Sequence, residues 1–171
     1  VPADIYHQLI HIAHEKGVYT ILNASGAPFE AGLEAKRLLA KPDLRASADW
    51  ILNKRVNGQE TAIQVANEIV ERGIQIAVIS YEDTRDIIAT PEQVWSAESK
   101  NQKVANIIGT SEAVIAGFAI KLVEEEREGL PDMIRFAMAC GLASALTEDE
   151  EFHTREEIFE CLPCIELKRL K

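Results

Sequence analysis

Asn106-Ile107-Ile108-Gly109-Thr110-Ser111-Glu112-Ala113-Val114-Ile115-Ala116-Gly117-Phe118 is the stretch that decides the fold. A strand end passes through Gly109 into a helix that begins with small residues. Backbone N–H groups at such a helix start, together with the helix dipole, form a site for anions. An acid in the first turn, here Glu112, is favourable on any helix, so an ordinary capped helix is the alternative interpretation.

Short apolar runs on either side of this stretch predict strands. The candidate strands are 18–22, 38–40, 74–80, 87–90 and 94–97. The runs 18–22 and 74–80 hold no charge or proline, which is typical of strands covered on both faces. The last two candidates resemble a hairpin that turns at Pro91. The sequence offers only these short strands, together with more helices than a sheet of this size needs to cover it. This imbalance suggests that part of the sheet lies in a missing segment or a partner chain.

Helical patterns separate these runs. The candidate helices are 28–37, 44–52, 59–72, 110–127, 130–146 and 154–162, and another starts at Pro2 with Ile5, Leu9 and Ile12 on one face and stops at Gly17. Strands that alternate with helices predict an α/β fold with a parallel sheet, here in a single domain over residues 1–171. We interpret the start at Val1 as that of a processed or excised piece.

Composition restricts the class of partner. Hydrophobic residues make up 47% and charged residues 27% of the 171 residues, which is ordinary for a globular chain. The net charge of −10 argues against nucleic acid or an anionic membrane as partner. No apolar run reaches the length of a membrane span, and three cysteines make no disulfide framework, so we expect the cytoplasm as location.

The 106–118 stretch resembles the second signature of the ribokinase-like sugar kinases, phosphofructokinase B branch, which runs Thr-Val-Gly-Ala-Gly-Asp and then Ala-Gly-Phe. The flanking segments resemble the same family in the same order: VYTILNASG, AGLEAKRLLAKP, IQIAVIS and RFAMACGLASA. The likeness is greatest to 1-phosphofructokinase and tagatose-6-phosphate kinase. It implies a partial three-layer (αβα) sandwich, the C-terminal nucleotide-binding half of a sugar kinase, without the N-terminal part that supplies the sugar site and lid.

The resemblance also implies roles for particular residues. Glu112 occupies the position of the general base that takes the proton from the sugar hydroxyl, and Gly109, Thr110 and Ser111 occupy the anion hole for the transferring phosphate. The nucleotide and magnesium loops correspond to Lys41, Asp43, Ser80 and Glu82. ATP and Mg²⁺ are implied as cofactors in this way only.

Several positions that serve the chemistry depart from the family pattern. Glu112 replaces an aspartate, and its extra methylene moves the carboxylate by a distance that can cost ~10²-fold in rate. Ser111 replaces a glycine, and its Cβ or its φ angle is expected to hinder the amides. The glutamate that organises magnesium waters is replaced by Ala46. Glu82 and Asp83 stand in a loop that the family builds as Ser-Leu-Gly, with Asp86 close behind.

Two other groups of residues are weighed as sites and set aside. His7, His11 and His14 share a helical face that we expect to be solvated, with metal binding as the minor alternative. Cys161 and Cys164 form a Cys-x-x-Cys pair at a predicted helix C-terminus, where the dipole does not lower a thiol pKa. We assign a metal to neither group.

Three hypotheses for function follow. The chain is the ATP-binding part of a sugar-phosphate kinase that is inactive as it stands, or a non-catalytic binding or regulatory module, or a self-associating remnant of the fold. Because 18–22 and 74–80 lack the charges and prolines that protect sheet edges, one of them is expected to lie near an open edge and to pair with a second copy across a two-fold axis. A companion chain that supplies the missing half is the other possible partner.

Overall fold

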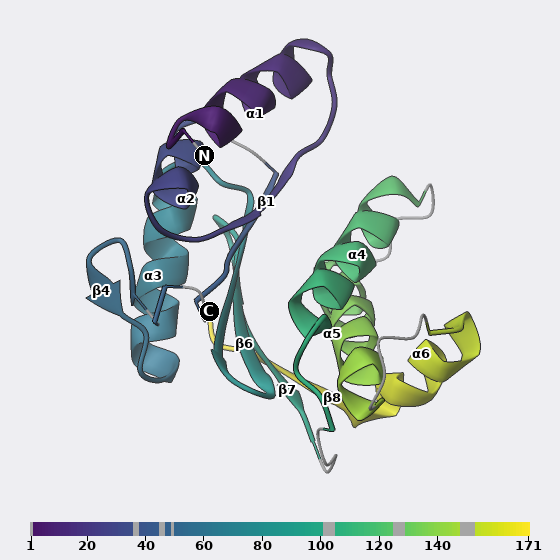
Figure 1. Ribbon diagram of the computed structural model, residues 1–171. Coiled ribbons are helices and arrows are strands. Elements are labelled where there is room, and N and C mark those ends of the chain that lie inside the picture. Colours follow the sequence, from purple (N-terminus) through teal and green to yellow (C-terminus); the bar gives the residue numbers. More distant parts are fainter. Residues whose placement is uncertain are drawn as a thin grey trace. The chain divides into compact units, whose positions relative to one another are not determined.

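A six-stranded sheet organises the protein, in a computed structural model that describes residues 2–35, 38–44, 47–48, 50–100, 105–124, 129–147 and 153–171 (Figure 1). The strand order is β1-β2-β5-β6-β7-β8. Their bounds are β1 Ile21–Ala24, β2 Leu39–Pro42, β5 Ile76–Glu82, β6 Arg85–Ala89, β7 Val94–Ser99 and β8 Ile165–Arg169. The pairs β1–β2 and β2–β5 are parallel, as the two-sided apolar runs predicted.

The chain divides into two compact units. Unit 1 holds the residues up to Glu82 together with Asp86–Trp95 and Arg169–Lys171, and unit 2 holds Asp83–Arg85 and Ser96–Lys168. The strands β6, β7 and β8 each have residues in both units. The single-domain interpretation of the sequence stays a prediction.

Unit 1 buries its helices against the parallel strands. Its helices are α1 Ile5–Glu15, α2 Gly26–Leu33 and α3 Gln59–Glu71. The buried residues of α3 are Ala62, Val65, Ala66 and Ile69, the spacing of one helical face, and α3 packs against β5. Gly73, at φ 96°, ends α3 in the left-handed conformation that glycine adopts most easily, so the predicted helix 59–72 is confirmed.

Unit 2 is built on two helices that approach closely. Its helices are α4 Thr110–Val123, α5 Leu130–Leu146, α6 Arg155–Cys161 and the 3₁₀ turn η1 Leu162–Cys164. They confirm the predicted helices in the last third of the chain. A Cβ built at Gly117 of α4 would lie 2.6 Å from Ala137 Cα of α5, and one at Gly141 would lie 2.5 Å from Val114 Cγ2. The two glycines therefore set the distance between α4 and α5.

The predicted helix over 44–52 is wrong. Within the described part of this segment the chain instead forms a small hairpin, β3 Trp50–Ile51 and β4 Lys54–Arg55. Its two turn residues, Leu52 and Asn53, have φ of 50° and 59°, as a type I′ turn requires. Leu52 and its neighbour Ile51 are both buried, at 5% and 3% exposed, so the core of unit 1 takes up the tip of the hairpin. Tertiary burial overrode the local pattern here.

The face assigned to the first helix is also wrong. Ile10 is the buried residue of α1, whereas Leu9 and Ile12 are 54% and 50% exposed. The helix contacts α2, and Tyr6 and Ile10, one turn apart, pack into the core of unit 1. His7, His11 and His14 are exposed, as expected.

The strand order decides between the two candidate edge strands. β1 lies at one end of the order and is the edge, although it begins at Ile21 rather than at residue 18. Val18 and Tyr19, just before it, are 57% and 63% exposed. β5 lies between β2 and β6, so of the two alternatives 74–80 is excluded as an edge.

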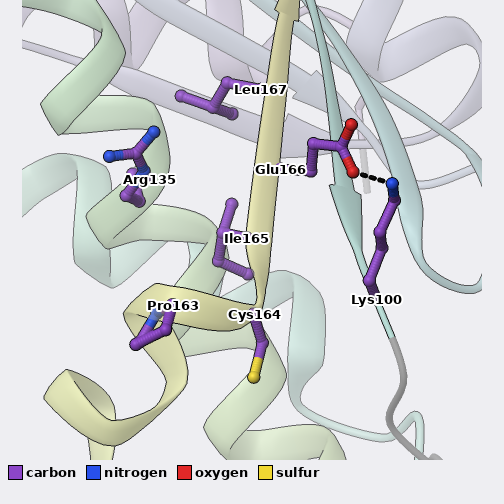
Figure 2. Close-up of a pocket in the computed structure, with 7 residues that line it drawn as sticks. All are labelled: Lys100, Arg135, Pro163, Cys164, Ile165, Glu166 and Leu167. Carbon is purple, nitrogen blue, oxygen red and sulfur yellow. Dashed lines mark ion pairs between the residues drawn. The ribbon is translucent and has the colours of Figure 1, made fainter.

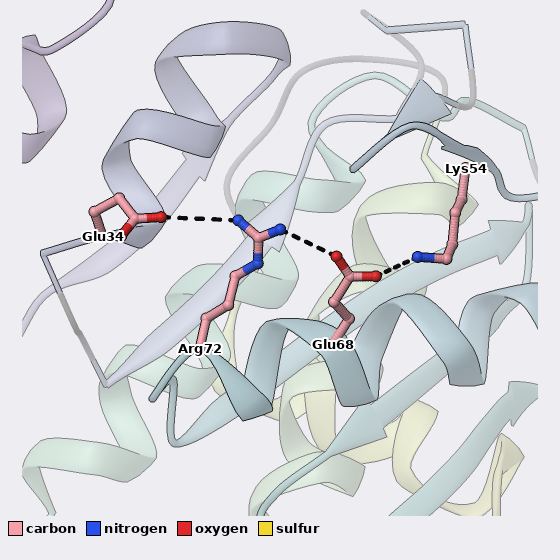
Figure 3. A network of polar contacts seen from close by, with 4 residues as sticks. All are labelled: Glu34, Lys54, Glu68 and Arg72. Carbon is pink, nitrogen blue, oxygen red and sulfur yellow. Dashed lines mark hydrogen bonds and ion pairs between the residues drawn. The ribbon is translucent and has the colours of Figure 1, made fainter.

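An ion-pair network ties the hairpin to α3 (Figure 3). Glu68 pairs with Lys54 of β4 and accepts a 3.0 Å hydrogen bond from Arg72 Nη2, while Arg72 Nη1 lies 3.8 Å from Glu34 Oε1. The hydrogen bond from Lys54 is the main cause that lowers the pKa of the Glu68 carboxyl below its ordinary value. The network thus secures a hairpin that has very few ladder bonds of its own.

Replacement of Gly117 by alanine is expected to lower the free energy of unfolding by about 1–3 kcal/mol, because the new methyl group would overlap the backbone of α5. Urea denaturation measures the change. Gly129→Ala is the matched control, since a Cβ there meets only Pro131 Cδ at 3.4 Å. A Gly117→Ala variant as stable as the control would show that α4 and α5 are further apart than described.

Glu68→Gln is expected to destabilise the protein by about 0.5–1 kcal/mol at neutral pH, the range for partly exposed ion pairs. Because the folded-state pKa of Glu68 lies below the usual value of 4.5, its contribution is present above that pH and is lost as pH falls through the folded-state pKa. The difference from the wild type should therefore vanish in acid. Denaturation series at several pH values test this, with Glu71→Gln on the same helix as control.

Candidate functional site

The predicted anion hole lies at the start of α4, within unit 2. Gly109 precedes the helix with φ 83°, a left-handed conformation that a residue with a Cβ adopts only under strain. Ile108 N donates to Asn106 Oδ1 at 2.9 Å, and Thr110 Oγ1 donates to Ile107 O at 2.9 Å. These local bonds fix the turn, so the first backbone amides of α4 point out of its N-terminus.

Ser111 and Glu112 follow in the first turn of α4. Glu112 is exposed and Ser111 is half-buried. Ser111 lies inside the helix and is not among the described residues with positive φ, so its φ angle is not the obstacle, and hindrance by its Cβ stays a prediction. Gly109 alone carries the left-handed turn. The geometry suits a small anion at the helix start, with a carboxylate beside it.

Unit 1 brings two of the predicted loop residues together. Lys41 lies near the carboxyl end of β2, and its Nζ donates to Ser80 Oγ of β5 at 2.9 Å. Ser80 Oγ in turn donates to Asp86 Oδ1 of β6 at 2.5 Å. Lys41 is 2% and Asp86 6% exposed, and they are the buried charged residues of the described chain. We refer to Lys41, Ser80 and Asp86 as the buried relay.

Asp86 is the member of this relay that sequence reasoning missed. The sequence placed it only close behind the nucleotide loop, whereas in the structure it is buried and accepts the hydrogen bond from Ser80. Burial raises the pKa of its carboxyl above the ordinary value, while the charge of Lys41 and the hydrogen bond from Ser80 act against that rise. The signal in the sequence was its place directly before the apolar run Ile87-Ile88-Ala89. An acid at such a position in a buried strand needs a hydrogen-bond donor or a cation beside it.

The other loop residues lie nearer the surface of unit 1. The Asp43 amide donates to Ala24 O at 2.9 Å, which holds the chain as it leaves β2 beside the end of β1. Glu82 and Asp83 are exposed at the turn between β5 and β6. Arg45 and Ala46, which carry one of the expected departures from the family, lie outside the described residues. The loop positions Lys41, Asp43, Ser80 and Glu82 belong to unit 1, whereas Asp83 and the anion-hole positions belong to unit 2.

A pocket of about 410 Å³ lies elsewhere in unit 2 (Figure 2). Its lining residues are Lys100, Arg135, Pro163, Cys164, Ile165, Glu166 and Leu167. Two of these residues, Lys100 and Glu166, form an ion pair, and the Lys100 amide donates to Cys164 O at 3.0 Å. None of the predicted site residues lines this pocket.

The Cys-x-x-Cys pair ends α6 and η1. Burial raises the pKa of the Cys161 thiol above its ordinary value. Burial also raises the pKa of the Cys140 thiol, to about 11. Neither thiol is therefore activated as a nucleophile. All three cysteines lie in the described part of the chain and no disulfide joins them. The described residues contain no group of three or more His, Cys, Asp or Glu side chains placed to hold a metal ion.

These residues fit the implied cofactors only in part. The start of α4 has the amides and the glycine that a phosphate requires, whereas Lys41 is buried and bonded to Ser80 rather than presented to a ligand.

No helix within the described ranges is long and apolar enough to cross a membrane.

Comparison with known proteins places the chain among sugar kinases. It is 24% identical over 170 residues to a 1-phosphofructokinase of Bacillus subtilis, covering 99% of this chain and 54% of the relative. A tagatose-6-phosphate kinase of Staphylococcus epidermidis is also 24% identical, with 96% and 54% covered. The chain thus spans about half the length of the curated relatives it matches.

Solved structures agree. A possible 1-phosphofructokinase from Thermotoga maritima superposes with a TM-score of 0.90 at 25% identity, over 100% of this chain and 54% of that one. The tetrameric inhibited form of Escherichia coli phosphofructokinase-2 gives a TM-score of 0.82 at 22% identity over 95% and 52%. The likeness confirms the ribokinase-like α/β fold. The model of the pfkB family carbohydrate kinases matches residues 1–152, and the chain therefore belongs to that family.

Proposed function

We propose that this chain is the nucleotide-facing part of an ATP-dependent sugar-phosphate kinase fold that binds phosphate weakly and does not transfer it. The observation that carries the proposal is the start of α4, where Gly109 in a left-handed turn opens the helix amides toward a small anion. In the proposed complex this helix start would hold a phosphate group of ATP.

The loss of transfer follows from the residues around that helix start. Glu112, at the position of the general base, carries one methylene more than aspartate and is exposed to solvent. A misplaced or fully hydrated base loses most of its advantage in proton transfer. Lys41, the cation expected near the phosphates, is engaged inside unit 1. The same observation favours a binding or regulatory module as the second candidate function.

Self-association is the third element of the proposal. β1 is an edge strand of four residues, and the residues from 18 to 24 include no lysine, acid or proline that would discourage pairing. Val18 and Tyr19 beside it are exposed. A second copy of the chain is the partner we propose, with a companion polypeptide as the alternative outcome. The tetramer described for Escherichia coli phosphofructokinase-2 is consistent with association in this family.

The purified chain is expected to show no ADP release above background with fructose 1-phosphate, fructose 6-phosphate or tagatose 6-phosphate. In ¹⁵N NMR titrations with ATP and Mg²⁺, weak binding should shift the amide resonances of Gly109, Thr110, Ser111 and Glu112. Turnover in the coupled assay would overturn the loss of transfer. Unchanged resonances at these amides would overturn the phosphate site itself.

Tyr19→Lys is expected to convert a dimer into a monomer, because a lysine beside the open edge of β1 opposes strand pairing. Light scattering of the wild type should give the mass of a dimer or larger. A crystal structure of that assembly should show an interface of at least ~1,000 Å². The matched control is Val123→Lys, which places the same charge on an exposed apolar position of α4 that is 74% exposed. A monomeric wild type at micromolar concentration would contradict the expected pairing.

A further inference from the structure

We propose that Cys161 and Cys164 form a reversible dithiol–disulfide pair, so that the end of α6 is a modification site for a low-molecular-weight disulfide. Both residues belong to unit 2, and both are free thiols in the structure. The pair is separate from the start of α4, on which the proposed phosphate site depends. Either site can therefore be lost without the other.

The chain from Cys161 to Cys164 forms one tight turn. α6 ends at Cys161, and η1 continues from Leu162 through Cys164. The Leu162 amide donates to Phe159 O and the Ile165 amide donates to Leu162 O, which are the bonds of a 3₁₀ helix. In such a helix the side chains of residues i and i+3 lie one above the other, and three residues rise about 6 Å. A disulfide joins Cα atoms that lie about 4.4–6.8 Å apart, so this turn presents the two cysteines at a separation that a disulfide can bridge.

Pro163 stabilises the turn whether the thiols are free or joined. Its ring fixes φ near the helical value, and it has no N–H group to leave unpaired near the start of η1. Ile165, which begins β8 directly after the turn, is 5% exposed and anchors the other end in the core. Because the turn already holds both thiols, a reaction between them is intramolecular and requires little further ordering.

The two thiols differ in their access to solvent. Cys161 is 7% exposed, whereas Cys164 is half-buried. Burial raises the pKa of the Cys161 thiol, and the negative charges of Cys164 and of two acids on α6 raise that pKa further, as expected for sulfurs that lie close together. Cys164 is therefore the thiol that a solute meets first, and Cys161 is the thiol that attacks from inside. No helix N-terminus activates the pair, so we expect the exchange to be slow.

A pocket provides room for the oxidant beside Cys164 (Figure 2). Cys164 lines the pocket of about 410 Å³ together with residues of α5 and β8, and this volume is in the range of pockets that hold small organic molecules. Cys164 lies at one end of the group of lining residues, and its sulfur is directed away from the ion pair of Lys100 and Glu166. That ion pair therefore does not cover the thiol.

The oxidation consists of two thiol–disulfide exchanges. The Cys164 thiolate attacks one sulfur of the external disulfide, forms a mixed disulfide and releases one thiolate, which takes up the proton that Cys164 lost. The Cys161 thiolate then attacks the sulfur of Cys164 and displaces the second external thiolate, which takes up the proton of Cys161. The protein loses two electrons and two protons, and the external disulfide gains both. A dithiol reverses the reaction by the same steps.

Cys140 of α5 is the competing partner for Cys161. Burial raises the pKa of the Cys140 thiol to about 11, and the nearby Cys161 contributes to that rise. However, a Cβ built at Gly117 would lie 3.0 Å from Cys140 Sγ, so this sulfur faces α4 rather than the end of α6. The orientation favours the bond between Cys161 and Cys164.

Oxidised glutathione is the probe that tests the pair. We would equilibrate the folded chain with mixtures of oxidised and reduced glutathione, alkylate the remaining thiols and identify the products by intact mass and peptide mapping. The wild type is expected to lose two of its three thiols to an internal bond between residues 161 and 164, and dithiothreitol should restore both. Three free thiols even in oxidised glutathione alone, or a bond that includes Cys140, would overturn the proposal.

Single serine variants test the order of attack. Cys161→Ser is expected to accumulate one glutathione on Cys164, because the thiol that would displace it is absent. Cys164→Ser should react about tenfold or more slowly than the wild type, because only buried thiols remain. Cys140→Ser is the matched control, since it removes a buried thiol but keeps the pair, and it should behave as the wild type. Reaction of Cys164→Ser at the wild-type rate would contradict the role of Cys164.

The contribution of the fold is measured on the wild type alone, so the test does not depend on how the variants fold. The same equilibrium is repeated in urea, where the turn is lost. The folded chain is expected to keep the internal disulfide at a glutathione ratio about tenfold more reducing than the unfolded chain, because the turn holds the two thiols together. Equal ratios would mean that the Cys-x-x-Cys sequence closes the bond without help from the structure, and the site would not be a property of the fold.

Discussion

Lys41 of β2 places an ammonium group in the interior of unit 1, and polar side chains of the adjacent strands β5 and β6 compensate for its burial. A buried cation is tolerated only with an opposite charge or several acceptors close by. Ser80 and Asp86 meet that need from β5 and β6. The parallel register of β1, β2 and β5 then aligns Asn23 with Lys41, so that Asn23 Nδ2 can donate to the backbone oxygen of Lys41 at 3.0 Å. The polar chemistry at this edge of the sheet follows from one buried charge.

Unit 2 depends on a constraint of another kind, which is volume. Gly117 and Gly141 leave no room for a Cβ between α4 and α5, and the close approach of these helices fixes the position of the α4 start. A Cβ at Gly109 would lie 3.6 Å from Ser144 Oγ of α5, so the turn before α4 also lies against α5. The start of α4, where an anion site is predicted, is therefore positioned by packing further along the helix.

Sequence reasoning succeeded where long periodic or uninterrupted apolar patterns decide the structure. The helices α3, α4, α5 and α6 and the central strand β5 follow from such patterns, as does the glycine turn at Gly109. It failed at the hairpin around Leu52 and on the face of α1, where tertiary burial selects residues that local periodicity does not mark. It assigned Lys41 and Ser80 to two separate loops and did not foresee that Asp86 is buried beside Ser80, because which acid is buried depends on strand pairing rather than on its neighbours in sequence.

The hairpin of β3 and β4 has a consequence for the order of folding. Leu52 and Asn53 hold the left-handed conformation without the help of glycine, which costs local free energy of order 1–3 kcal/mol per residue. The hydrogen bonds of two-residue strands do not offset that cost. The turn therefore needs the burial of Leu52 in the core and the ion pair between Lys54 and Glu68 of α3. We therefore expect the segment 50–55 to assemble late, so that substitutions there would speed unfolding more than they slow folding.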